Sequence, residues 1–167
     1  MSNKIIVESF NDQAVYKHIL DNFCRSEADI EPIDSGPDWV ELDGLEETKL
    51  LTKLQEIQSD LIRAQKTPKV GIIIDLDNSS ITDRIVFLNK ICTKAFSINI
   101  DIENSNEFKT YNLHEYDLDF ELGYYFSGLD GQGELEHILK AIADTSTSHH
   151  ANCLEQGWVT CLEKKDK

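Results

Sequence analysis

The feature that most constrains the fold is an apolar run that ends in two carboxylates. Residues 70–74 read Val-Gly-Ile-Ile-Ile, and Asp75-Leu76-Asp77 follows directly. A run of β-branched residues without polar alternation is typical of a buried parallel strand. If the backbone stays extended through Asp77, both acids lie on the same side, at the carboxyl edge where open α/β sheets build their sites. Because close carboxylates repel each other unless they share a cation or a proton, the pattern favours a metal site.

The remaining pattern predicts alternating strands and helices. Strands are expected at 4–8, 39–42 and 97–102, and residues 118–122 alternate again before Tyr124-Tyr125-Phe126. Helices are expected from Asp12, over the apolar stripe of residues 50–62, after a cap at Thr82, and over residues 135–142. We therefore expect an α/β fold with a mostly parallel, Rossmann-like sheet, helices on both faces and later strands that extend it. Residues 1–145 are predicted to form one domain, and 146–167 a C-terminal extension packed on it or trailing from it.

Charge and composition narrow the classes of function. The 167 residues include 31 acidic and 16 basic side chains, a net charge of -15, which argues against an independent nucleic-acid binder. No stretch of about 18 apolar residues exists, so we expect no membrane span. The N-terminus lacks the apolar region of a signal peptide, and the four cysteines form no Cys-x-x-Cys. A cytoplasmic protein with reduced thiols is the expectation.

Glu8 ends the first predicted strand and adds a third acid. If the first strand and the 70–74 strand are neighbours, Glu8, Asp75 and Asp77 converge at one edge of the sheet. Such hard oxygen ligands suit Mg²⁺ or Mn²⁺. The alternative is local: Asp75 and Asp77 cap the next helix or form an Asx-turn.

Glu8, followed by Asp12 and some sixty residues later by Asp75-Leu76-Asp77, resembles the Toprim domain. This domain occurs in topoisomerases, bacterial primases, small RNA-maturation nucleases and nucleases of the OLD (overcoming lysogenization defect) family. The chain is most similar to small stand-alone Toprim-like proteins, in which an arginine-bearing helix and a Gly-x-Leu-Glu segment follow. Arg84 and Gly133-Glu134-Leu135-Glu136 match these features, and the resemblance spans about residues 4–143.

The resemblance implies a nuclease or related enzyme acting on phosphodiester bonds. Asp75, Asp77, Glu8, Asp12 and Glu136 would then be metal ligands for Mg²⁺ or Mn²⁺. Glu8 would also serve in acid–base catalysis, and Arg84 would steady a phosphate. The implied substrate is DNA or RNA, which the chain would bind with the help of a partner protein. A homodimer is also consistent with the resemblance.

Each supporting residue has an alternative role. Asp12 would cap the first helix, Glu136 would stabilise a helix N-terminus, and Arg84 would pair with a surface acid. Ser9 stands where the family usually has glycine, which permits a tight turn beside a phosphate.

Three competing functions remain open. The first is a non-catalytic Toprim-like subunit that works with a partner such as an ATPase. The second is a flavodoxin-like or response-regulator-like domain, which also places acids at strand ends. The third is zinc binding by His149, His150, Cys153 and Cys161. The spacing of these four residues matches no structural zinc pattern.

Overall fold

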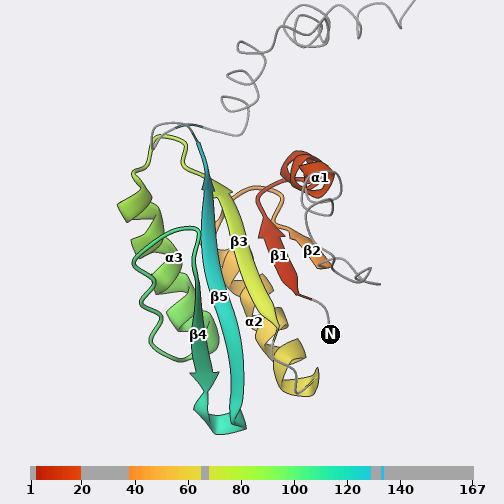
Figure 1. Cartoon of the computed structure of the whole chain (residues 1–167), viewed down its shortest axis with the longest axis vertical. Coiled ribbons are helices and arrows are strands. Elements are labelled where there is room, and N and C mark those ends of the chain that lie inside the picture. Colours follow the sequence, from red (N-terminus) through yellow and green to blue (C-terminus); the bar gives the residue numbers. More distant parts are fainter. Residues whose placement is uncertain (1–2, 20–37, 65–67, 129–132, 134–167) are drawn as a thin grey trace, which may run out of the picture.

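The computed structural model describes residues 3–19, 38–64, 68–128 and 133. These residues contain a five-stranded sheet and three α-helices (Figure 1). The strands are β1 (Lys4–Val7), β2 (Asp38–Glu41), β3 (Lys69–Asp75), β4 (Phe108–Leu113) and β5 (Leu118–Ser127). The helices are α1 (Phe10–Ile19), α2 (Glu47–Ala64) and α3 (Ile81–Phe96). Within these described ranges, none of the helices is long and apolar enough to cross a membrane.

The sheet has the order β2-β1-β3-β5-β4, and only its β4–β5 pairing is antiparallel among the described strands. β3 lies at the centre, with Val7 of β1 and Tyr125 of β5 on either side of Ile73. The carboxyl ends of β1, β3 and β5 therefore meet at one edge, and the predicted mostly parallel α/β fold is confirmed.

Helices cover both faces, as predicted. On one face, Val70, Ile72 and Ile74 are buried in the core together with the apolar stripes of α2 and α3. On the other face, α1 lies over the sheet, where the ring of Tyr16 contacts that of Tyr125 edge to face at 5.9 Å. Figure 1 shows α2 and α3 together, with α1 set apart beside β1.

The strand predicted at 97–102 is wrong, because α3 satisfies the backbone groups that a neighbouring strand would otherwise bind. The Ile100 N–H donates to Thr93 Oγ1. The Ile102 N–H donates to Asn89 Oδ1, and Asn89 Nδ2 donates back to the Ile102 carbonyl. The antiparallel strand is instead β4, which the pattern did not indicate.

Two boundaries also differ from expectation. α3 begins at Ile81 rather than after Thr82, because the Ser80 side chain caps it by accepting the Asp83 N–H at 3.1 Å. The β-like pattern that alternates over 118–122 and continues to Phe126 is one strand, β5, which ends at Ser127. The helix predicted over 135–142 and the extension 146–167 lie outside the described residues.

Candidate functional site

Two of the predicted ligands come together at neighbouring strand ends. Glu8 directly follows β1, and Asp75 is the last residue of β3. The strands pair in parallel, so both acids lie at the same edge of the sheet. The Asp75 N–H donates to Glu8 Oε2 at 3.4 Å. The structure thus brings Glu8 and Asp75 into contact.

Asp77 lies where the chain leaves the sheet. The expected extended backbone through Asp77 is wrong: β3 ends at Asp75, and Asp77 has a φ of 50°. Aspartate tolerates this left-handed conformation better than most residues do. The Asp77 N–H donates to the Gly133 carbonyl at 3.0 Å, and the Gly133 N–H donates back at 3.2 Å. This two-bond bridge ties the site to the chain beyond β5.

Arg84, in the first turn of α3, pairs with Asp77. Its Nη2 lies 2.5 Å from Asp77 Oδ2 and donates to the Leu76 carbonyl at 3.4 Å. The Arg84 side chain is only 13% exposed. Arg84 therefore neutralises an acid of the site, and its buried Nε–H has no partner among the described residues.

Asp12 and Ser9 form a reciprocal cap at the start of α1. The N–H and Oγ of Ser9 donate to Asp12 Oδ2 at 2.8 and 2.7 Å, and the Asp12 N–H donates to Ser9 Oγ at 3.3 Å. This is a capping box with aspartate in place of glutamate. The capping role considered for Asp12 is present, and its partner is Ser9.

Two hydroxyl groups at this edge were missed by sequence reasoning. Ser127 ends β5 opposite Asp75, and its Oγ lies 2.5 Å from the phenol oxygen of Tyr16. The four-residue spacing from Asp12 to Tyr16 along a helix was an available signal for the tyrosine. Ser127 needs the strand order, which a single sequence does not give. Burial raises the pKa of Tyr16 to about 12, so its phenol is neutral at physiological pH.

The electrostatics of the edge act on Glu8. Partial burial raises the pKa of Glu8 above its usual value, and the negative charges of Asp77 and Asp12 add to the rise. The hydrogen bond from Asp75 and the positive charge of Arg84 oppose it. Glu8, Asp12, Asp77 and Arg84 therefore form one interacting group.

The acids suit a hard cation by chemistry and position, but protein partners hold them. Carboxylates at adjacent strand ends are ligands that Mg²⁺ and Mn²⁺ accept readily. Within the described residues, however, no group of three or more His, Cys, Asp or Glu side chains is arranged to hold a metal ion. One carboxylate oxygen of Asp77, Oδ2, is already paired with Arg84. Glu136 and the histidine–cysteine cluster of residues 149–161 lie outside the described residues.

Comparison with known proteins places the chain in a family. The model of the DUF3226 family, described as a protein of unknown function, matches residues 2–165. The chain belongs to the DUF3226 family. Neither a curated protein nor a solved structure matches this DUF3226 chain significantly. The family match includes every candidate ligand, from Glu8 to Glu136, while its description assigns them no chemistry.

Proposed function

We propose that this DUF3226 protein performs Toprim-type, metal-dependent phosphodiester chemistry on nucleic acid, in the simplest case as a nuclease. One observation carries the proposal: Glu8 and Asp75 meet at the edge shared by β1 and β3, where Asp77 and Arg84 also act on Glu8. The resemblance of Glu8 and Asp75-Leu76-Asp77 to the Toprim pattern supplies the chemistry for that edge.

In this proposal, Asp75, Asp77 and Glu8 hold Mg²⁺ or Mn²⁺, and Asp12 and Glu136 complete the ligand set. The bound ion would polarise the phosphate and lower the pKa of a coordinated water. Glu8, whose pKa is raised, is suited to transfer a proton closer to neutral pH than an ordinary carboxylate.

Arg84 has a complementary role in this proposal. Its Nη2 holds Asp77, so the positive guanidinium group lies beside the acids, where it would stabilise the negative charge of a bound phosphate. Because the chain carries a net charge of -15, we expect a partner protein to contribute the positive surface that binds the nucleic-acid backbone.

The chain offers a matched control for the activity test. Asp117-Leu118-Asp119 repeats the tripeptide Asp75-Leu76-Asp77, but at the amino end of β5. We expect Mg²⁺- or Mn²⁺-dependent cleavage within a panel of single- and double-stranded DNA and RNA. The Asp75→Asn/Asp77→Asn variant should lose more than the roughly 10–100-fold typical of residues outside the ligand shell. Asp117→Asn/Asp119→Asn should remain active. Cleavage of no substrate with either metal would contradict the proposal.

A second candidate is a non-catalytic Toprim-like subunit that works with a partner such as an ATPase. The observation in its favour is that Asp77 is bound to Arg84 and Asp12 to Ser9. Thermal unfolding with millimolar Mg²⁺ or Mn²⁺ separates the two functions, since a ligand that binds the native state stabilises it. A rise in Tm that Asp75→Asn/Asp77→Asn abolishes, relative to its own metal-free Tm, supports the metal site. An unchanged Tm favours the subunit.

A further inference from the structure

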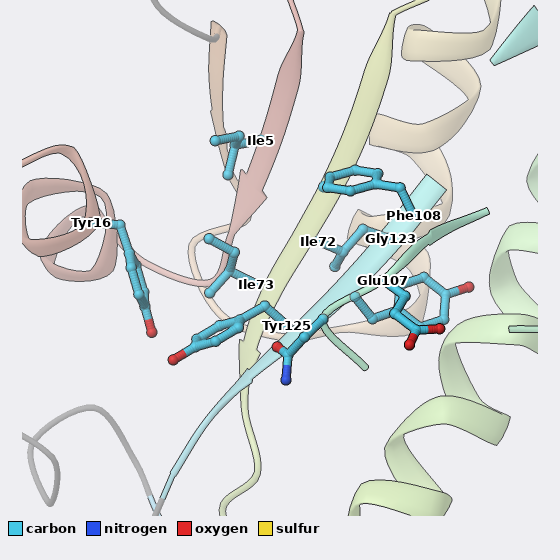
Figure 2. Close-up of a pocket in the computed structure, with 11 residues that line it drawn as sticks. Ile5, Tyr16, Ile72, Ile73, Glu107, Phe108, Gly123 and Tyr125 are labelled. Atoms are coloured by element: carbon cyan, nitrogen blue, oxygen red, sulfur yellow. The ribbon is translucent and has the colours of Figure 1, made fainter. Parts of the chain in front are cut away.

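A cavity of about 570 Å³ opens on the face of the sheet opposite α2 and α3 (Figure 2). We call it the apolar groove, and its main lining residues are Ile5, Tyr16, Gly71, Ile73, Phe108, Gly123 and Tyr125. Figure 2 shows the rings of Tyr16 and Tyr125 beside Ile73, with Phe108 on the far side. Phe108 and Tyr125 are 52% and 40% exposed, which is high for large apolar side chains that share one surface.

The sequence of the strands indicates that another element covers this groove. In the middle of β3 both faces are apolar, a composition typical of strands that are covered on both sides. Gly71 and Gly123 are paired neighbours on β3 and β5. Glu107 and Phe108 already approach Gly123 closely, whereas a Cβ at Gly71 would meet its nearest atoms only at 3.9 Å. The groove floor at Gly71 therefore leaves room for an occupant with a narrow apolar face.

We propose that the apolar groove is the docking site of this chain's own residues 134–143, the C-terminal docking segment. Its apolar residues recur at helical spacing, while His137 and Lys140 fall on the opposite side of such a helix. These apolar residues are Leu135, Ile138, Leu139 and Ile142. The segment therefore has the single apolar face that the groove requires.

The position and length of the segment fit the groove. Gly133 is hydrogen-bonded to Asp77, so the segment starts at the carboxyl end of β3. Ile73 and Gly71 lie two and four residues back from the end of β3 at Asp75, about 7 and 13 Å at roughly 3.3 Å per residue. A ten-residue helix is about 15 Å long. The segment thus reaches the groove by running antiparallel to β3.

Photo-cross-linking in the full chain tests the proposal. The photoreactive p-benzoylphenylalanine replaces Tyr125 in the groove or, as a matched control, Tyr116, which is 43% exposed and does not line the groove. We expect position 125, and not 116, to form an intramolecular cross-link to residues 134–143. A cross-link to residues 20–37, a cross-linked dimer, or a monomer without a cross-link would each overturn the proposal. The dimer would identify a second copy as the occupant.

Two substitutions that each add one carboxylate give an independent readout. Leu139→Asp changes the apolar side of the segment, and His137→Asp changes the opposite side. Leu139→Asp should lower Tm by roughly 5 °C and abolish the cross-link from position 125. His137→Asp should preserve both. Equal effects of the two variants, or an unchanged cross-link in Leu139→Asp, would overturn the proposal. None of these measurements uses metal or nucleic acid, so their outcome is independent of the proposed function.

Discussion

At Glu8, the surroundings favour the neutral carboxyl group, and this has a consequence for stability. A carboxyl whose pKa is higher in the folded than in the unfolded chain binds more protons when folded. The stability it contributes is fully present below the unfolded value of 4.5 and is lost as the pH rises through the raised folded pKa. The charged form of Glu8 therefore lowers the stability of the protein at neutral pH.

We predict that Glu8→Gln stabilises the protein at about pH 8 and has little effect at about pH 3.5, where Glu8 is protonated in both states. Glutamine retains an oxygen that accepts the Asp75 N–H but carries no charge. The expected rise in Tm at the higher pH is roughly 1–3 °C, measured by calorimetry. A lower Tm at pH 8 would show that the carboxylate contributes to stability.

Arg84 and Arg63 allow a comparison between a partly buried ion pair and an exposed one. Arg84→Met removes the partner of Asp77, so we expect a loss of about 1–2 kcal/mol in the free energy of unfolding. Arg63 is 81% exposed and lies 3.7 Å from Asp60, so Arg63→Met should change this free energy by well under about 1 kcal/mol. Urea denaturation measures both, and equal losses would mean that the Arg84–Asp77 pair is also solvent-screened.

At the scale of the strands, the paired glycines Gly71 and Gly123 differ in whether they have room for a side chain. A Cβ at Gly123 would lie 2.8 Å from the Glu107 carbonyl oxygen, a backbone atom that has little freedom to move. A Cβ at Gly71 would meet its nearest atoms at an ordinary 3.9 Å. We predict that Gly123→Ala destabilises the protein by about 1–3 kcal/mol, while Gly71→Ala changes its stability little. Urea denaturation measures the difference, and equal effects would contradict the predicted clash.

The elements with strong local signals were predictable from sequence. The apolar run before Asp75 and the stripe of α2 identify their elements because their periodicity reflects burial directly. The segment from Ile98 to Ile102 was wrongly predicted to be a strand, because its alternating isoleucines pack into the core without pairing with a neighbouring strand. Its backbone instead bonds to Asn89 and Thr93, and such tertiary partners leave no periodic signal.

The candidate site was likewise predictable only where the local pattern of the strands determines it. Glu8 and Asp75 each stand at the end of a predicted strand, so the assumption that β1 and β3 are neighbours places both acids at one edge of the sheet. The left-handed turn at Asp77 and its pairing with Arg84 depend on Gly133 and α3, which lie elsewhere in the sequence. Local sequence therefore indicated which acids gather, but not which partners hold them.

At the scale of the whole molecule, the net charge of -15 produces repulsion that salt screens. We predict that Tm rises when NaCl is increased from about 0.02 to 0.3 M. Millimolar Mg²⁺ should raise Tm further than NaCl of the same ionic strength if the carboxyl edge binds the ion specifically. A Tm that falls with NaCl would mean that favourable surface ion pairs outweigh the repulsion.

The central position of β3 also governs the order of folding. Ile72 pairs with Ile6 of β1 and Tyr124 of β5, which lie 66 and 52 residues away along the chain. Such long-range pairings form slowly because large loops must close first, whereas α2 and α3 are local structures. We therefore expect the edge that joins Glu8 to Asp75 to form after α2 and α3, so any chemistry at this edge would wait until the strands have paired.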